Sequence, residues 1–185
     1  MRVFLAVDLD AKVKSGIASM IERLKGSNGA LKWVKPENIH VTLYFFGEVT
    51  EKDCISLQQL LKKALKAIHP FTVSVKGVAG FPSLLRPRVL WVGIDNPTKE
   101  LETIYSLVSR HLQESTIGIS RDTKGYTPHV TIARIKGPFN RYILRKLEDY
   151  REHTFGCFQV NNVVLYQSIL QRQGPLYEPL KIYEL

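Results

Sequence analysis

The chain contains the tetrapeptide His40-Val41-Thr42-Leu43, and nearly the same tetrapeptide, His129-Val130-Thr131-Ile132, returns in its second half. Only five histidines are present, and two of them open this pattern. On a strand, His40 and Thr42 would share one face and the apolar residues the other. A single His-x-Thr pattern is more often a structural pair, but two copies in matching positions indicate a shared catalytic site.

The repeat extends beyond the two tetrapeptides. Residues 2–8 (Arg-Val-Phe-Leu-Ala-Val-Asp) resemble residues 88–95 (Arg-Val-Leu-Trp-Val-Gly-Ile-Asp). Each half reads as strand, helix, His-Val-Thr strand, helix, strand, strand. Two copies with so long a period do not make a solenoid, and they favour an internal duplication about a pseudo-twofold axis. We therefore expect one bilobal domain over residues 1–185, with pseudo-repeats at about 1–87 and 88–185.

The order of elements predicts an α+β fold with two antiparallel sheets, flanked by helices, around a central cleft. Helices are expected after the capping residues Asp10 and Thr50, from Pro97 and Thr98, and over 140–150. Strands are expected at 2–9, 31–34, 39–46, 71–78, 88–95, 155–166 and 177–183, besides the second motif strand.

Length and composition are those of one soluble globular domain, with 185 residues, 44% hydrophobic and 23% charged. The two cysteines, Cys54 and Cys157, lack metal or redox spacing and indicate a reducing compartment. The apolar run at 3–7 is too short for a signal peptide or a membrane span. We therefore expect a cytoplasmic monomer that makes no membrane contact.

The charge is strongly positive and unevenly spread. The formal net charge is +9 and the pI about 9.6. No acidic residue occurs between Cys54 and Ile94, and Asp122 is the one acid between Ser120 and Lys146. Such blocks indicate a polyanionic partner, most simply nucleic acid. A basic surface kept for solubility explains the charge equally well.

Two imidazoles and two hydroxyls in one groove suit a phosphodiester reaction. A neutral imidazole takes a proton near neutral pH, and an imidazolium gives one to a leaving oxygen. Threonine hydroxyls donate hydrogen bonds to phosphate oxygens. Two histidines alone are a poor zinc site, so neither a metal nor a cofactor is expected.

Strand alternation also places the residues that follow each motif. Tyr44 and Phe46 would share the histidine face of the first motif strand, where one of them could stack on a base. Arg134 would lie on the face of Val130, and would reach the groove only if the strand is bulged.

The chain resembles the 2H phosphoesterase superfamily, and within it the RNA 2′,3′-cyclic phosphodiesterases, also called 2′-5′ RNA ligases. The resemblance covers nearly the whole chain. The matching segments are residues 2–7, 40–47, 80–82, 89–93, 128–134, 165–168 and 174–177.

The resemblance implies a bilobal α+β fold with its active site between the lobes. It implies hydrolysis of an RNA 2′,3′-cyclic phosphate end to a 2′-phosphate and, in reverse, ATP-independent 2′-5′ ligation. His40 would be the proton donor and His129 the proton acceptor, while Thr42 and Thr131 would hold phosphate oxygens. The partner would be RNA with a cyclic phosphate end, tRNA halves included.

One segment departs from the family pattern. Lys124-Gly125-Tyr126-Thr127 stands where members often carry an Arg-Pro-Phe-like run, although a positive charge and an aromatic remain. The expected substrate contacts are Tyr126, Arg134, Phe46 and Lys124. Two other readings stay open: an RNA- or nucleotide-binding module without catalysis, and a phosphodiesterase for a small cyclic nucleotide.

Overall fold

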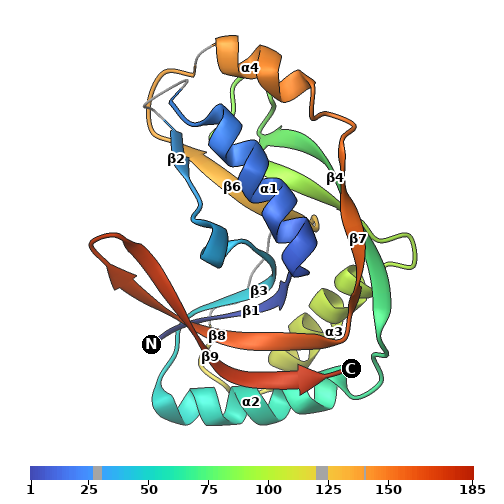
Figure 1. Cartoon of the computed structure of the whole chain (residues 1–185). Helices are drawn as coiled ribbons and strands as arrows, with labels where there is room; N and C mark the ends of the chain where they lie inside the picture. The colour runs from blue at the N-terminus through green and yellow to red at the C-terminus, as the bar shows by residue number, and fades with distance from the viewer. Residues whose placement is uncertain (27–30, 120–124, 140) are drawn as a thin grey trace.

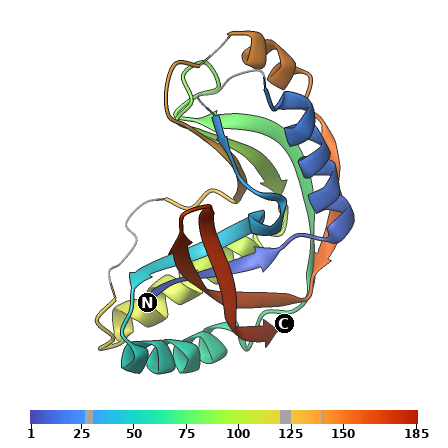
Figure 2. The same ribbon diagram turned by 60° about the vertical axis from the view of Figure 1, so that its left-hand side comes forward.

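The chain forms a curled antiparallel sheet with helices on its outer side (Figure 1 and Figure 2). The computed structural model describes residues 1–26, 31–119, 125–139 and 141–185. The helices are α1 (Ala11–Leu24), the 3-10 helix η1 (Pro36–Asn38), α2 (Glu51–Leu65), α3 (Glu100–Glu114) and α4 (Arg141–Glu148). The strands are β1 (Arg2–Asp8), β2 (Leu31–Trp33), β3 (His40–Glu48), β4 (Phe71–Phe81), β5 (Val89–Asp95), β6 (His129–Ile135), β7 (Thr154–Val160), β8 (Asn162–Gln171) and β9 (Gly174–Glu184).

The strands belong to one sheet rather than to the two that were expected. Their order is β7-β4-β5-β6-β3-β1-β8-β9, and β2 pairs with β6. The motif strands β3 and β6 join the two halves of the sheet through one residue pair, Val41 with Val130. The α+β class and the antiparallel pairing are confirmed, whereas the separation into two sheets is not, because this pair makes the hydrogen bonding continuous.

The segment expected as one strand over 155–166 is divided at Asn161. Before it, β7 pairs with β4 in one half of the sheet. After it, β8 pairs with β1 in the other half. The chain crosses between the halves here, and alternation within each strand could not reveal that change of partner.

Local capping explains where two helices begin. The Asp10 carboxylate accepts a hydrogen bond from the Lys12 amide at 2.8 Å, and the Thr50 hydroxyl accepts one from the Asp53 amide at 3.1 Å. Both caps are those expected from the sequence. Helix α3 begins at Glu100, later than expected, because Lys99 adopts a left-handed conformation with φ of 59°.

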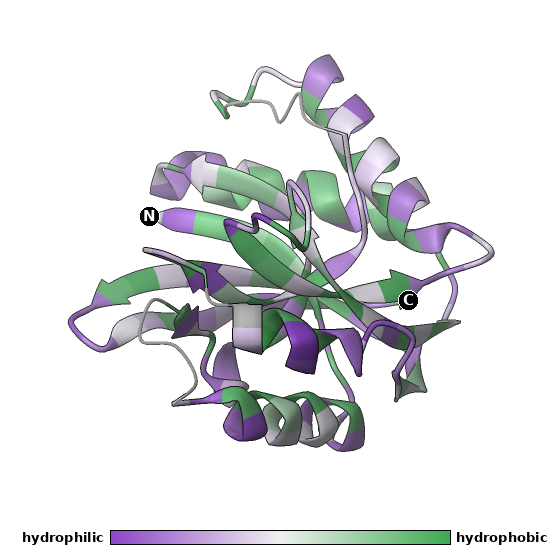
Figure 3. Cartoon of the chain, turned by 90° about the horizontal axis from the view of Figure 1, so that it is seen from above, coloured by the Kyte–Doolittle hydropathy of each residue, from purple (hydrophilic) through white to green (hydrophobic). Residues whose placement is uncertain are grey.

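Apolar side chains fill the space between the sheet and the helices. Five apolar side chains of α1 are buried against the sheet; they are Val13, Ile17, Met20, Ile21 and Leu24. Figure 3 shows the helices striped with hydrophilic and hydrophobic residues, as expected where one face packs on a sheet. Within the described residues, every helix is too short or too polar to cross a membrane.

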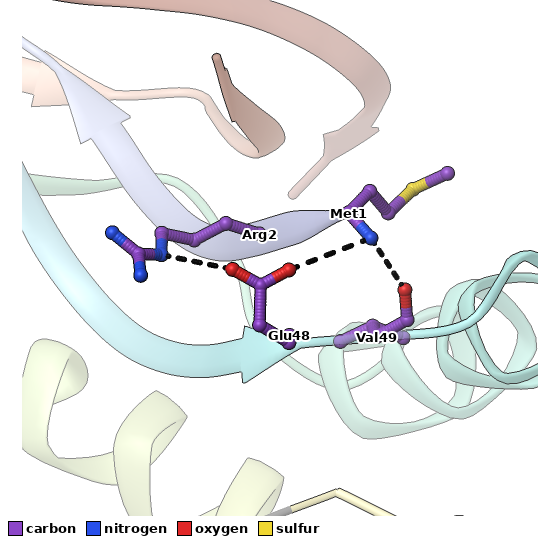
Figure 4. A network of polar contacts seen from close by, with 4 residues as sticks. All are labelled: Met1, Arg2, Glu48 and Val49. Atoms are coloured by element: carbon purple, nitrogen blue, oxygen red, sulfur yellow. Dashed lines mark hydrogen bonds and ion pairs between the residues drawn. The ribbon is translucent and has the colours of Figure 1, made fainter. Parts of the chain in front are cut away.

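The start of β1 is tied to the end of β3 (Figure 4). The Met1 amino group donates a hydrogen bond to the Val49 carbonyl oxygen at 2.8 Å and lies 3.7 Å from a Glu48 carboxylate oxygen. The Arg2 guanidinium lies 3.3 Å from the other oxygen of Glu48. These exposed ion pairs contribute little energy individually, and they join the start of β1 to the end of the strand that carries the first motif.

Candidate active site

The two motif strands meet side by side. Val41 and Val130 are opposed partners in the antiparallel pair β3 and β6. One step forward on one strand is one step back on the other, so His40 lies in register with Thr131, and Thr42 with His129. The valines point to the core, where Val41 is 1% and Val130 0% exposed. The structure therefore brings both histidines and both threonines to the same junction of the sheet.

The fourth residue of each motif forms a β-bulge. Leu43 has no partner in the register with β1, and Ile132 has none in the register with β5, although their neighbours on both sides are paired. Both side chains are buried in the core. A bulge adds one residue to a strand and so reverses which later residues face each side.

The bulges decide which downstream side chains reach the groove. Phe45, 47% exposed, lines the same cavity as His40 and Thr42, whereas Phe46 is 1% exposed in the core. The expectation that Phe46 faces substrate is corrected for this reason. Arg134 occupies the position of β6 that corresponds to Phe45, and it lines the cavity because that strand is bulged too.

Each motif histidine is held by a main-chain carbonyl two residues earlier. The Nδ1 of His40 lies 2.8 Å from the Asn38 oxygen, and the Nδ1 of His129 lies 2.7 Å from the Thr127 oxygen. A carbonyl oxygen only accepts, so both Nδ1 atoms carry the proton and donate. The Nε2 atom of each neutral ring is then free to accept a proton. In the free protein, Nε2 of His40 lies 2.9 Å from the Thr42 hydroxyl, which donates to it.

His40 packs against aromatic side chains from β1 and from the hairpin of β8 and β9. Its ring centroid lies 5.0 Å from that of Phe4 and 5.3 Å from that of Tyr177. Burial lowers the pKa of His40, against the opposing effects of the Asn38 carbonyl and the Asp8 carboxylate. Asp8 is the cross-strand partner of His40 and accepts a hydrogen bond from the Tyr166 hydroxyl at 2.7 Å.

His129 has different surroundings. Its ring lies 5.4 Å from Phe81 and 5.9 Å from Trp91, both in edge-on geometry. Its cross-strand partner is Gly93, so the position that Asp8 occupies beside His40 carries no side chain here. The two imidazoles are therefore chemically unequal, because one faces a carboxylate and the other does not.

A cavity of about 510 Å³ opens at the junction. His40, Thr42, Thr131 and Arg134 line it, together with Phe45 and residues of the β8–β9 hairpin. His129 lies outside this lining; a second hollow of about 440 Å³ adjoins the segment of Thr127 and Pro128 that precedes it. The charge of His129 is the smallest of the effects that lower the pKa of His40.

Two other expected substrate contacts do not reach the cavity or cannot be placed. Tyr126 stacks on Tyr105 of α3 with ring centroids 4.9 Å apart, and it is absent from the cavity lining. Burial raises its pKa, and it packs against the core, so its expected role is corrected. Lys124 lies outside the described residues. Within them, no group of three His, Cys, Asp or Glu residues is arranged to hold a metal ion.

Several cavity residues were missed from the sequence. Phe45 was missed because the bulge changes the face on which it lies. Tyr177 is far from His40 in the sequence, and Asn38 belongs to no motif. Asn38, 8% exposed, donates from its side chain to the Pro175 carbonyl oxygen at 2.8 Å. Lys32 and Lys136 also line the cavity. Their charge was visible in the sequence, but their place beside the motif depends on the pairing of β2 with β6.

Comparison with known proteins identifies relatives of the chain. A family model described as LigT like phosphoesterase matches residues 7–91 and again 93–177. A protein of Methanothermobacter thermautotrophicus named RNA 2′,3′-cyclic phosphodiesterase is 34% identical over 187 residues, which covers 100% of this chain and 99% of the relative. A protein of the same name from Archaeoglobus fulgidus is 36% identical over 186 residues, with 100% of both chains covered.

Solved structures share the fold. A protein of Thermus thermophilus superposes with a TM-score of 0.85 at 25% identity, covering 100% of this chain and 98% of the other. Escherichia coli LigT complexed with 3′-AMP superposes with a TM-score of 0.80 at 24% identity, covering 100% of this chain and 97% of that protein.

Proposed function

Because the chain belongs to the LigT-like phosphoesterase family, we propose that it hydrolyses the 2′,3′-cyclic phosphate end of RNA to a 2′-phosphate by two-histidine acid–base catalysis. His40 is the proton donor and His129 the proton acceptor in this proposal. Thr42 and Thr131 hold the non-bridging phosphate oxygens. The relatives' shared name supports the reaction, and the junction of the motif strands supports the mechanism.

The observation that carries the mechanism is the register of β3 and β6. His40 lies across from Thr131, so His129 is its diagonal neighbour on the facing strand. Diagonal neighbours in an antiparallel pair lie about 7–8 Å apart, with their Cβ atoms somewhat closer. A phosphate between the two rings would then meet one Nε2 atom on each side. The two threonines complete the site, one across from each histidine.

The reaction balances with these groups alone. A water molecule gives a proton to Nε2 of His129 while its oxygen attacks phosphorus. The bond from phosphorus to the 3′ oxygen breaks, and Nε2 of a protonated His40 gives that oxygen its proton. Asp8 opposes the lowering of the His40 pKa by burial, and no side chain occupies the corresponding place beside His129, which supports His40 as the donor. When a 5′ hydroxyl attacks in place of water, the same two proton transfers give a 2′-5′ bond, and the roles of the histidines exchange when that bond is cleaved.

The same proposal includes the organisation of the protein and its surroundings. The chain acts as one bilobal domain, residues 1–185, with pseudo-repeats at about 1–87 and 88–185. Equivalent bulges at the fourth residue of both motifs and the double match to the family model support the duplication. We propose a cytoplasmic monomer whose substrates are RNA fragments with cyclic ends, tRNA halves among them.

Substitution of each histidine tests the mechanism. His40→Ala and His129→Ala should each reduce turnover of a cyclic-ended oligonucleotide by at least about 10²-fold, the contribution of one general acid or base. His69→Ala is the matched control, because His69 is exposed and lies outside the cavity lining. Circular dichroism should show all three variants folded. Retention of wild-type turnover by either motif variant would overturn the mechanism, and an intact cyclic end with wild-type protein would indicate a binding module.

A further inference from the structure

A row of cations lies along the short pairing of β2 with β6. Lys32 and Arg134 are directly opposed partners in this antiparallel pair. Lys136 follows two residues after Arg134, and all three side chains are exposed and line the cavity. We call Lys32, Arg134 and Lys136 the cationic ledge. It begins at the active site, because Arg134 lies two residues beyond the second motif and lines the same cavity as His40 and Thr131.

The ledge is electrostatically unfavourable in the free protein. Like charges directly opposite each other in a sheet are destabilising. Among the described residues, no carboxylate lies within ion-pair distance of any of the three, and no acidic side chain lines the cavity. Lys35, nearby in the lining, does have a partner, since it lies 3.9 Å from Glu37. An arrangement of this kind gains stability when an anion neutralises it.

The position of the ledge indicates a chain of phosphates rather than a single one. Lys136 lies five residues beyond Thr131, which is about 16 Å of extended strand. A phosphate held by Thr42 and Thr131 cannot also contact Lys136. In RNA with a cyclic phosphate at its 3′ end, further phosphates lie only on the 5′ side. The strand can therefore leave the active site in one direction, and the ledge offers a continuous path for its backbone.

We propose that the cationic ledge binds the phosphodiesters on the 5′ side of the reacting nucleotide, so that the enzyme selects oligonucleotide ends over cyclic mononucleotides. This inference rests on the proposed function and adds the path of the substrate. Phe45 and Trp33 line the same cavity and offer aromatic faces beside that path.

The test compares substrate length and salt dependence. KM is measured for a 2′,3′-cyclic mononucleotide and for a pentanucleotide with the same end, using wild type and the double variant Lys32→Ala with Lys136→Ala. The wild type should have a KM for the pentanucleotide lower by about tenfold, and the double variant should lose most of this advantage. Lys63→Ala, an exposed substitution on α2 outside the cavity lining, should keep it.

Binding of a fluorescein-labelled pentanucleotide that ends in a 2′-phosphate gives a second readout. Between about 50 and 200 mM salt, the slope of log Kd against log salt should fall by about 1.4 in the double variant, since each phosphate contact on a single strand contributes about 0.7. Equal KM values for both lengths in the wild type, or an unchanged slope in the variant, would overturn the proposal that the cationic ledge binds these phosphodiesters. Failure to hydrolyse either substrate would instead overturn the proposed function.

Discussion

The side chain of Asn38 donates a hydrogen bond to the main-chain oxygen of Pro175 at 2.8 Å, although the two residues are far apart in sequence. The carbonyl oxygen of the same asparagine accepts the Nδ1 proton of His40 at 2.8 Å. Pro175 belongs to β9, and the hairpin of β8 and β9 forms one wall of the cavity. A single buried residue therefore joins that wall to the imidazole that we propose as the proton donor.

We expect Asn38→Ala to affect both stability and catalysis. The Pro175 carbonyl would lose its donor, which costs about 1–3 kcal/mol if the oxygen stays buried. The hairpin that carries Tyr177 would also lose its link to η1, so kcat/KM should fall by about tenfold. Urea unfolding and steady-state kinetics measure the two effects. Asn38→Asp, which places a carboxylate oxygen against a carbonyl, should be at least as damaging. Wild-type values for both quantities in Asn38→Ala would contradict this link.

Asp8 offers a way to assign the roles of the histidines. Its carboxylate raises the pKa of His40, against the lowering caused by burial, so Asp8→Asn should lower that pKa further. A proton donor is active only when protonated, and kcat/KM reports the free enzyme. The alkaline limb of the pH profile should therefore move to lower pH, while the acid limb, which depends on the general base, stays in place.

The control for this prediction is Tyr166→Phe. It removes the hydroxyl that donates to Asp8 at 2.7 Å and leaves the carboxylate charge beside His40. Its alkaline limb should lie at a pH above that of Asp8→Asn. If the acid limb moves in Asp8→Asn instead, His40 is the base and the assignment is reversed. If neither limb moves, Asp8 has no influence on the reaction.

Chelation should leave the reaction unaffected. The motifs supply two imidazoles and two hydroxyls, whereas zinc in proteins usually takes three or four protein ligands. Turnover of a cyclic-ended oligonucleotide after dialysis against EDTA should therefore equal that of untreated enzyme. Added Zn²⁺ or Mg²⁺ should not increase it. A loss in EDTA that one metal ion restores would show that the histidines act with a metal.

Much of this architecture could be predicted because it depends on local chemistry. The caps Asp10 and Thr50 and the apolar stripe of α1 are determined by neighbours within one or two turns. Repetition of the motif predicted that the two histidines share one groove, but not that β3 and β6 pair directly within one sheet. What could not be predicted depends on pairing between distant segments: the change of partner at Asn161, and the wall contributed by the C-terminal hairpin.

The bulges show the limit of alternation most clearly. Nothing in the sequence of the first motif marks Leu43 as an extra residue, because a bulged leucine and a paired leucine are equally apolar. Strand β3 pairs with β1 on one side and meets β6 on the other, and its register with β1 passes over Leu43. One unpaired residue exchanges the environments of Phe45 and Phe46, and the expected substrate contact moves by one position.

Phe45 and Phe46 are therefore a matched pair with opposite expected effects. Phe45→Ala removes a half-exposed ring from the cavity, so KM for a cyclic-ended oligonucleotide should rise several-fold, as expected if the ring stacks on a base, with little change in unfolding free energy. Phe46→Ala removes a ring that is 1% exposed and packs on Tyr44, which should cost about 3–5 kcal/mol of stability. Kinetics and urea unfolding of both variants separate the two. If Phe46→Ala raises KM and Phe45→Ala unfolds the protein, the alternation is unbroken and the bulge at Leu43 is not present.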